Sequence, residues 1–312
     1  MNVVNQNSVV AAHDNLEVWT RVHLVTLLYN SLNGLPAFMD SLLAQSMQDW
    51  RLYVIDNASP DRSAEYIARY SDPRIVTVCN QQNVGFAKGA NQGMRLAIEA
   101  GAEFVVLINN DTVFEPNFFT DLLAAREQSK ALVITPRIMS QQEPDVAWYA
   151  GGRLDYGWLF KNVHNPYDPA TPPVSTVDFA PGCCLGVDRQ VLEKIGLLDE
   201  SFFVYWEDTD FCMRLKKANI PITYVTKPSM LHFGGGSSGG ERSLGYARLY
   251  YKSYMLLLKK HFGLRYAIAS AIRLMMLEWG RPDKNKAYAR RMLASILSGL
   301  AAPLTTEISI SS

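Results

Sequence analysis

The amino-acid sequence predicts an α/β fold, a mostly parallel mixed sheet with helices on both faces, followed by a basic, mostly helical extension. In residues 21–110, short apolar runs rich in β-branched residues alternate with segments of helical periodicity. Each apolar run ends in Asn or Asp, which favour turns. Because strands that alternate with helices pair in parallel, this part of the chain predicts a layered α/β domain.

Four strands and three helices are predicted there in alternating order. The strands lie at Val22–Asn30, Arg51–Asp56, Arg74–Asn80 and Glu103–Ile108, and the helices at Pro36–Gln48, Ala64–Tyr70 and Met94–Ala100. Between the third strand and the third helix, the run NVGFAKGANQG predicts a glycine-rich loop.

The second half is less regular. Residues 140–176 are rich in Trp, Tyr, Gly and Pro and predict an irregular segment. Helices are expected at Gln190–Ile195 and from Asp208, then a strand over residues 222–233, and further helices over residues 244–291. The resulting domains are a flexible N-terminus at 1–20, one globular domain at 21–240 and a helical extension at 241–312.

Length and composition exclude several classes of protein. The chain has 312 residues, of which 48% are hydrophobic and 19% charged, which excludes disorder, collagen and a disulfide-stapled mini-protein. The four cysteines form no C-x-x-C pair, so neither a zinc site nor a disulfide framework is predicted. The N-terminus lacks a signal-peptide pattern, and no apolar run reaches the roughly 18 residues of a spanning helix. We expect a cytoplasmic protein.

The charge balance is zero overall but uneven along the chain. Residues 1–240 hold 18 Lys and Arg against 26 Asp and Glu, a net −8, whereas residues 241–312 hold 12 against 4, a net +8. The acidic main domain and the lack of a recognised motif argue against nucleic acid as a partner. The basic extension has an apolar side, as helices on anionic membrane surfaces do. A helical lid on the domain and a homo-oligomer contact are the open alternatives.

Polar clusters follow the predicted strands. They are Tyr29-Asn30, Asp56-Asn57, residues 83–91 and Asn109-Asn110-Asp111. In open α/β sheets, ligands bind beyond the carboxyl ends of the strands. Turn formation is the alternative explanation for any one cluster, but four clusters at successive strand ends favour a binding site.

Six motifs run in order through residues 22–240: TLLYNS, VIDNASPD, NVGFAKGANQG, LINNDT, FFVYWEDTDFCMRL and LHFGGGSS. Each is weak by itself, but the ordered set resembles glycosyltransferase family 2, and within it the rhamnosyltransferase-like branch. The resemblance implies a GT-A fold, a nucleotide-sugar donor, a divalent metal (Mg²⁺ or Mn²⁺) and inversion at the anomeric carbon.

The resemblance assigns one group of residues to the donor nucleotide. Asp56 takes the family's base-reading position, where a carboxylate accepts the N3–H of uracil or thymine. Tyr29 and Asn30 would line the same pocket. Asn83 and Lys88 belong to the glycine-rich run, where Lys88 would offset diphosphate charge and backbone N–H groups would face the anion. An ordinary capping or turn role is the alternative for each.

The run Asn109-Asn110-Asp111 takes the place of the family's Asp-x-Asp motif. Asp111 is its one carboxylate, so we assign it to the metal, and Asn109 and Asn110 to the donor nucleotide. His232, which precedes a glycine-rich run, would complete the metal shell as in the family. The alternatives are that Asp111 begins a turn and that His232 is structural.

Glu207 and Asp208 are the predicted catalytic pair. Inverting transfer needs a base that takes the acceptor hydroxyl proton, and the family's Glu-Asp motif puts that role on Asp208 with Glu207 beside it. Helix capping is the alternative for both acids. Trp148, Tyr156 and Trp158 are candidates for stacking on a sugar, or for the core.

These assignments predict an inverting, metal-dependent glycosyltransferase of cell-surface polysaccharide synthesis. It would move rhamnose from dTDP-rhamnose to a glycan or lipid-linked acceptor, peripheral on the inner face of the cell membrane. One alternative keeps the chemistry with a UDP-hexose or UDP-N-acetylhexosamine donor. The other is a non-catalytic nucleotide-sugar or glycan-binding protein, against which Asp111, Asp208 and His232 argue together, because a binder needs no base.

Overall fold

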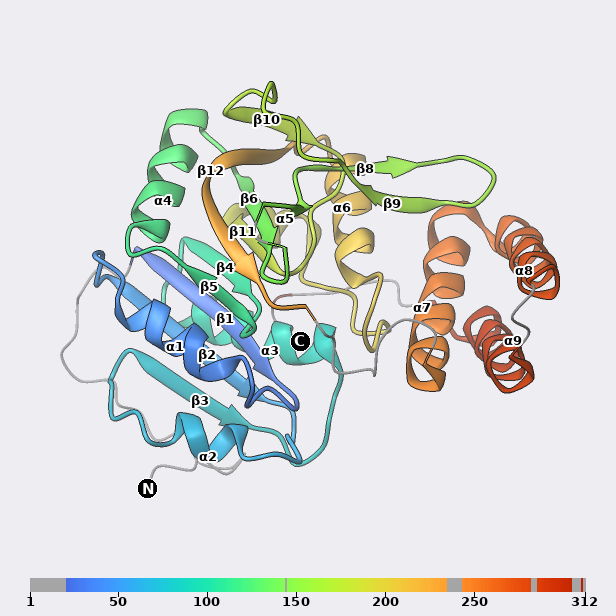
Figure 1. Ribbon diagram of the computed structural model, residues 1–312, viewed down its shortest axis with the longest axis horizontal. Helices are drawn as coiled ribbons and strands as arrows, with labels where there is room; N and C mark the ends of the chain where they lie inside the picture. Colours follow the sequence, from blue (N-terminus) through green and yellow to red (C-terminus); the bar gives the residue numbers. More distant parts are fainter. Residues whose placement is uncertain (1–20, 144, 235–242, 282–284, 305–309, 311–312) are drawn as a thin grey trace.

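The computed structural model describes residues 21–143, 145–234, 243–281, 285–304 and 310, and it has an α/β domain beside a bundle of helices (Figure 1). The predicted N-terminus at 1–20 and most of the glycine-rich run after His232 lie outside the described residues. The main sheet has the strand order β10-β12-β6-β11-β4-β1-β2-β3, with β5 paired to β12 and β7 to β6. The predicted mixed α/β sheet is confirmed.

The strands of this sheet are β1 (Val22–Leu28), β2 (Trp50–Asp56), β3 (Ile75–Cys79), β4 (Phe104–Ile108), β5 (Thr112–Phe114), β6 (Val133–Ser140), β7 (Ala147–Tyr149), β10 (Val174–Val177), β11 (Cys184–Asp188) and β12 (Ile222–His232). The four strands of the first half pair in parallel, and β11 lies antiparallel between β4 and β6. A separate hairpin consists of β8 (Gly152–Asp155) and β9 (Lys161–His164). The segment expected to be irregular therefore carries short strands.

The helices are α1 (Leu35–Leu43), α2 (Ser63–Ile67), α3 (Phe86–Glu99), α4 (Phe118–Ser129), α5 (Arg189–Ile195), α6 (Glu207–Lys217), α7 (Leu244–Phe262), α8 (Leu264–Trp279) and α9 (Lys286–Ala301). The prediction of a loop followed by a helix at Met94 is wrong, because α3 begins at Phe86. Gly85, with φ of 90°, makes the sharp entry into this helix. Gly89 and Gly93 then let α3 lie directly on β1, since a Cβ at either would collide with Leu27 or Val25.

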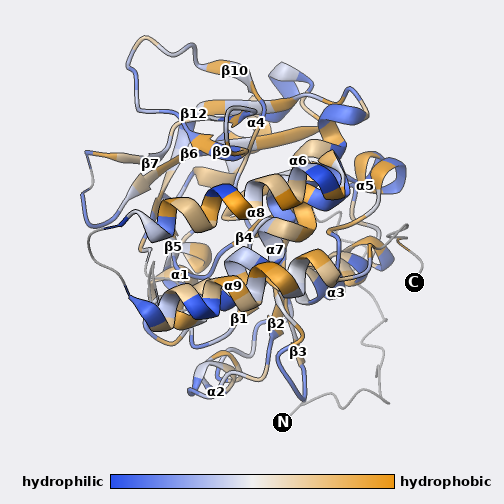
Figure 2. Ribbon diagram, turned by 90° about the vertical axis from the view of Figure 1, so that its right-hand side faces the viewer, coloured by the Kyte–Doolittle hydropathy of each residue, from blue (hydrophilic) through white to orange (hydrophobic). Residues whose placement is uncertain are grey.

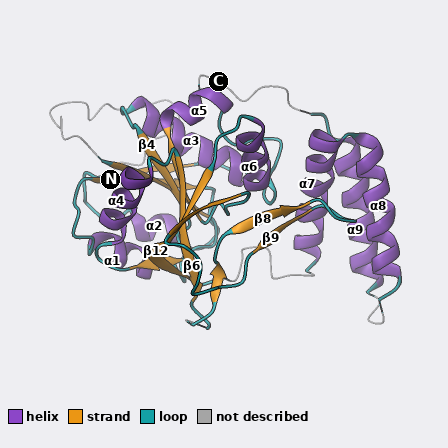
Figure 3. Cartoon of the chain, turned by 90° about the horizontal axis from the view of Figure 1, so that it is seen from above, coloured by secondary structure: helices purple, strands orange, loops and turns teal. Residues whose placement is uncertain are grey.

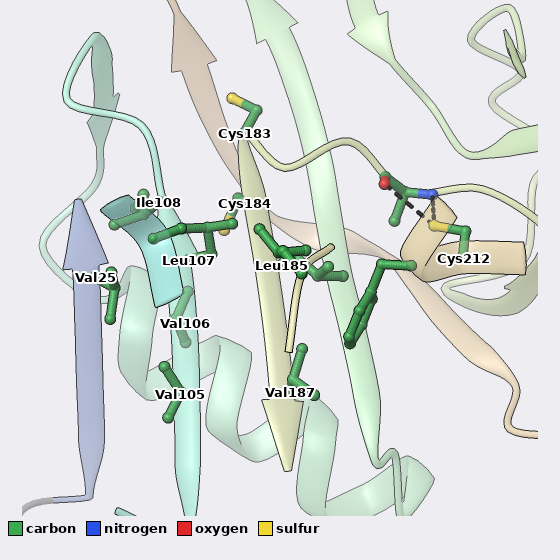
Figure 4. Close-up of a cluster of buried hydrophobic side chains, with 14 of the residues drawn as sticks. Val25, Val105, Val106, Leu107, Ile108, Cys183, Cys184, Leu185, Val187 and Cys212 are labelled. Carbon is green, nitrogen blue, oxygen red and sulfur yellow. Dashed lines mark hydrogen bonds between the residues drawn. The ribbon is translucent and has the colours of Figure 1, made fainter. Parts of the chain in front are cut away.

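The core lies around the central strands β1, β4 and β11 (Figure 4). Val25, Val106 and Leu185 are almost completely buried there, which explains why these strands are nearly continuous apolar runs. Burial of each such side chain contributes about 1.5–3 kcal/mol relative to leaving it exposed. Cys212 of α6 faces the same core, and its thiol bonds to the backbone of Ala180.

The three C-terminal helices stand together at one side of the sheet (Figure 3). Helix α7 contacts the domain: the Ser253 hydroxyl donates to the Val204 carbonyl at 2.9 Å, and the Tyr254 hydroxyl to the Phe160 carbonyl at 2.6 Å. Helix α8 adds a hydrogen bond from Arg273 to the Trp158 carbonyl. Among the described residues, no helix combines the length and the apolar character needed to span a membrane.

Candidate active site

The carboxyl ends of β1, β2 and β3 lie abreast, because Leu28 pairs with Asp56 and Asp56 with Cys79. Strand β4 runs parallel to β1 on its other side and ends at Ile108. The polar clusters that follow these strands consequently meet at one edge of the sheet, as predicted. This edge is where the candidate site begins.

Asp56 has one carboxylate oxygen that is free of hydrogen-bond partners within the described ranges. The residue is 4% exposed; its Oδ2 accepts from the Ser59 backbone N–H at 3.3 Å, while its buried Oδ1 has no hydrogen bond among the described residues. Leaving a buried acceptor unpaired costs about 1–3 kcal/mol. A ligand N–H at Oδ1 would remove that cost, which fits the base-reading role predicted for Asp56.

The other predicted donor residues surround this edge. Tyr29 is half-buried, and Asn30 is exposed with a left-handed φ of 55°. Asn83 accepts from the Gly85 backbone N–H at 2.9 Å, so its side chain shapes the turn into α3. Lys88 is exposed in the first turn of α3, on a helix and not on the predicted loop.

The run after β4 places Asp111 opposite His232. Strand β5 pairs with β12 so that Thr112 faces His232, and the Phe233 N–H donates to the Asp111 carbonyl at 2.9 Å. This ladder leaves 3.3 Å between Asp111 Oδ1 and His232 Nε2. Two residues far apart in the sequence, which the sequence analysis assigns to a metal, thus form one polar pair.

Asn109 and Asn110 are held by backbone bonds. The Asn109 N–H donates to the Cys183 carbonyl at 2.9 Å, and the Asn110 amide donates to the Leu27 carbonyl. Asn110 is buried and Asn109 half-buried. Asn110 therefore fixes the Asp111 loop to β1.

Asp208 lies at the start of α6, and its carboxylate accepts from the Gly182 N–H at 3.2 Å and from the Thr209 N–H at 2.6 Å. Gly182 is followed directly by Cys183, whose carbonyl receives the Asn109 N–H. One stretch of backbone therefore connects the Glu207–Asp208 turn with the Asp111 loop. The residues predicted for catalysis and those predicted for the metal are thus linked through two adjacent residues.

A strained turn presents the two acids. Tyr205 and Trp206 both have left-handed φ, 67° and 71°, which costs roughly 1–2 kcal/mol for each bulky residue. Aromatic packing holds this turn: the Trp206 ring lies 4.7 Å from that of Tyr254 on α7. Glu207 is 6% exposed and its Oε2 has no hydrogen-bond partner within the described part of the chain.

The pKa values of both acids are raised. Burial raises the pKa of Glu207 well above its ordinary value, and the neighbouring charge of Asp208 adds to this effect. Burial also raises the pKa of Asp208, although hydrogen bonds from Gly182 and Thr209 oppose it. A carboxylate with a raised pKa accepts a proton more readily, as a general base must.

Sequence reasoning missed His164 at the end of β9. Its Nδ1–H donates to the Trp148 carbonyl at 2.8 Å, and burial lowers its pKa while the charge of Asp208 opposes that shift. The Trp148 ring lies 4.7 Å from the rings of both His164 and His232. No motif surrounds His164 in the sequence, since the β8–β9 hairpin brings it to the site.

Trp148 is thus the predicted aromatic that borders the site, 37% exposed between two histidines. Tyr156 and Trp158 lie elsewhere: Tyr156 packs beside Phe160 and Phe262, and the Trp158 carbonyl accepts from Arg273 of α8 at 2.8 Å. These two aromatics therefore link the β8–β9 hairpin to the helical extension.

Asp210, two residues beyond Asp208, has a different role. Its carboxylate is fully buried and bonds to Arg214 at 2.9 Å, Lys260 at 2.7 Å and His261 at 2.8 Å. Burial acts to raise its pKa, but the His261 hydrogen bond and the Arg214 and Lys260 charges outweigh burial and lower it. Lys260 also bonds to Asp199 at 2.6 Å. These ion pairs anchor α7 to the domain.

Comparison with known proteins identifies the family. The family model for glycosyl transferase family 2 matches residues 24–196. The chain belongs to glycosyl transferase family 2. The predicted family membership is therefore confirmed, and curated relatives include rhamnosyltransferases and other hexosyltransferases.

Three relatives show the range within the family. The dTDP-rhamnosyl transferase RfbF of Shigella flexneri is 23% identical over 89% of this chain and 95% of its own. The N-acetylglucosaminyl-diphospho-decaprenol L-rhamnosyltransferase of Mycobacterium tuberculosis is 25% identical over 86% and 96%. The low-salt glycan biosynthesis hexosyltransferase Agl10 of Haloferax volcanii is 28% identical over 66% of this chain and 61% of its own length.

A solved structure confirms the GT-A arrangement. The crystal structure of GalNAc-T7 with UDP, GalNAc and Mn²⁺ covers 90% of this family 2 chain and 56% of its own chain, with a TM-score of 0.63. Its sequence is 12% identical, so the likeness concerns the fold.

Proposed function

We propose that this glycosyltransferase moves rhamnose from dTDP-rhamnose, with inversion, to a glycan or lipid-linked acceptor in cell-surface polysaccharide synthesis. The observation that carries the proposal is the connection of the Glu207–Asp208 turn to the Asp111 loop through the backbone of Gly182 and Cys183. The names of the Shigella and Mycobacterium relatives support rhamnose as the sugar.

Asp208 is the proposed catalytic base. Its raised pKa and its part-exposed position suit removal of a proton from an acceptor hydroxyl. The hydroxyl oxygen then forms the new bond at the anomeric carbon as the bond to the nucleoside diphosphate breaks on the opposite face. Gly182 and Thr209 hold the carboxylate in place. Glu207 lies beside it, and burial together with the neighbouring charge of Asp208 raises the pKa of Glu207 well above its ordinary value.

Asp111 and His232 fit a divalent metal, Mg²⁺ or Mn²⁺. An oxygen ligand and an imidazole lie 3.3 Å apart, and the Asp111 side chain is 32% exposed. Among the described residues, no group of three or more His, Cys, Asp or Glu could hold a metal ion. An ion bound by Asp111 and His232 would therefore take its other ligands from water and the donor phosphates. When bound, such an ion neutralises charge on the leaving diphosphate.

Asp56 is proposed to read the nucleobase through its buried Oδ1, for which the described part of the chain offers no hydrogen-bond partner. The rest of the proposed donor surface consists of Tyr29, Asn30, Asn83, Lys88, Asn109 and Asn110. Since thymine and uracil both carry an N3–H, a UDP-hexose or UDP-N-acetylhexosamine is the second candidate donor. The UDP of the GalNAc-T7 structure favours that alternative.

The proposed domain organisation is a catalytic domain at 21–240 and a helical extension at 241–312. We place the enzyme in the cytoplasm, peripheral on the inner face of the cell membrane. The name of the Mycobacterium relative includes a lipid diphosphate, which supports a location at the membrane.

A donor screen tests the proposal. The purified protein is mixed with dTDP-rhamnose, UDP-glucose or UDP-N-acetylglucosamine, with Mn²⁺, Mg²⁺ or EDTA, and released nucleotide is measured. We expect release to be fastest from dTDP-rhamnose, to require metal and to be lost in Asp208→Asn. Release from no sugar nucleotide would refute the enzyme assignment, whereas faster release from a UDP-sugar would select the alternative donor.

A further inference from the structure

An apolar groove is lined by residues of α8 and α9. These two helices stand on the side of the extension that faces away from the domain (Figure 2). The volume of the groove is about 570 Å³, and Ile272, Met276, Trp279, Ile296 and Leu297 are among the residues that line it. Met276 is 64% exposed and Trp279 80% exposed. Contiguous exposed apolar surface of this kind marks an interaction site.

The exposed apolar residues of α8 form one stripe. Leu264, Ile268, Ile272 and Met276 recur every four residues, and each is at least 43% exposed. Leu293 and Leu297 continue this surface on α9. Buried residues of α7, α8 and α9 already form the packing inside the bundle, so the stripe is not needed to hold the helices together.

The charges around the groove are almost all positive. Arg265 of α8 and Lys286, Arg290 and Arg291 of α9 are exposed. The one acid within the ranges of α8 and α9 is Glu278, which is 8% exposed. On α9, Lys286 and Arg290 precede Leu293 and Leu297 along the same helical face, so cations adjoin the apolar surface.

We propose that the α8–α9 groove docks on the surface of an anionic lipid bilayer. The apolar stripe and Trp279 would enter the boundary between head groups and acyl chains, and the flanking Arg and Lys side chains would meet lipid phosphates. Both helices would lie in the plane of the membrane, because neither spans it. The proposal does not depend on the donor or on the metal.

A second copy of the chain suits this surface less well. A symmetric dimer brings the same patch of both copies together, so Arg290 and Arg291 of one copy would approach those of the other. No exposed acid of α8 or α9, as far as these helices are described, is available to offset that repulsion. Lipid phosphate supplies the opposite charge.

Point variants test the groove more cleanly than deletion of the extension. Deletion would remove Lys260 and His261 from buried carboxylates of the domain, so loss of binding could reflect unfolding. Met276→Glu and Leu297→Glu place a carboxylate on exposed groove positions instead. Leu244→Glu, at a position on α7 that is 47% exposed and outside the groove, is the matched control.

The measurement is co-sedimentation of the full-length protein with vesicles of phosphatidylcholine, with or without an equal amount of phosphatidylglycerol. We expect binding to the mixed vesicles, weakened roughly tenfold or more by either groove variant and unchanged by Leu244→Glu. Arg290→Gln combined with Arg291→Gln should weaken it about 30-fold, since each cation near an anionic surface contributes a factor of about five.

The charge control is Lys194→Gln combined with Lys217→Gln, which removes two exposed cations from α5 and α6. Thermal melts of each variant verify folding. Absence of binding to the mixed vesicles would overturn the proposal. So would a groove variant that keeps full vesicle binding but turns a dimer into a monomer in light scattering, because the groove would then be an interface between copies.

Discussion

Helix α6 presents two acids that differ by two positions and have opposite surroundings. Asp208 is part-exposed at the site and has backbone donors and Thr209 as partners, and its pKa is raised. Asp210 is fully buried among Arg214, Lys260 and His261, and its pKa is lowered. The same residue type on one helical turn thus has surroundings that suit the proposed proton transfer in one case and anchors α7 in the other.

The largest effect is expected from Asp208→Asn. An amide cannot take the acceptor proton, so the transfer rate should fall about 1000-fold, while dTDP affinity changes by about twofold or less. Rates come from nucleotide release and affinity from calorimetry. Asp178→Asn removes an acid that is 41% exposed beyond the site and serves as control. Normal turnover of Asp208→Asn would show that another group is the base.

Asp111→Asn should lower activity by roughly 100-fold, because it removes the carboxylate that pairs with His232 and with it much of the charge stabilisation by metal. The expected signature is loss of the Mn²⁺ dependence of dTDP binding in a metal titration. Equal metal response in variant and parent would place the ion elsewhere. In contrast, Asp208→Asn should lower the transfer rate and leave dTDP binding nearly unchanged, so the two variants distinguish a role in donor binding from a role in proton transfer.

His164→Phe should reduce kcat/KM by roughly tenfold, with the aromatic packing against Trp148 preserved. We expect His164 to act through Trp148 and Asp208 as a positioning residue. Its charge lowers the pKa of Asp208, so the acidic limb of the pH–rate profile, where Asp208 becomes protonated, should move to higher pH in the variant. An unshifted profile would reduce His164 to a packing role.

Asp210→Asn should leave activity per folded molecule nearly unchanged and destabilise the fold by about 3–5 kcal/mol, because buried cations lose their carboxylate. The folded-state pKa of Asp210 is lowered, so the ionised carboxylate stabilises the fold at pH values above the ordinary Asp pKa. This stabilisation disappears as the pH falls toward the pKa of the folded state. In thermal melts, the difference in melting temperature between variant and parent should therefore become smaller as the pH is lowered. A difference that is constant with pH would argue against the ion pairs.

The features that depend on local sequence patterns were predicted correctly for the first four strands. Periodicity and turn residues placed the first four strands near their observed bounds, and their parallel pairing brought the polar clusters to one edge. The start of α3 was missed because its glycines, which permit close contact with β1, have the composition of a loop. Glycine and asparagine in the sequence indicate turns, but they do not show that a helix will lie close to a strand.

Contacts between distant parts of the chain could not be predicted from the sequence. His164 reaches Trp148 through the β8–β9 hairpin, which has no periodic signal of its own. Lys260 and His261 looked like ordinary members of a basic helix, but they bond to Asp210, some fifty residues earlier. From the sequence, the basic extension could be a membrane-surface element, a lid on the domain or an oligomer contact. In the structure α7 packs on the domain, whereas α8 and α9 carry exposed apolar residues.

The most direct test of this division of roles is the turnover rate of Asp208→Asn against Asp210→Asn at equal concentrations of folded protein, below the melting temperature of both. The account predicts near-complete loss of transfer in Asp208→Asn and a rate within about threefold of the parent in Asp210→Asn. Equal losses, or the reverse order, would contradict it, because the proton acceptor would then not be the acid at the exposed end of α6.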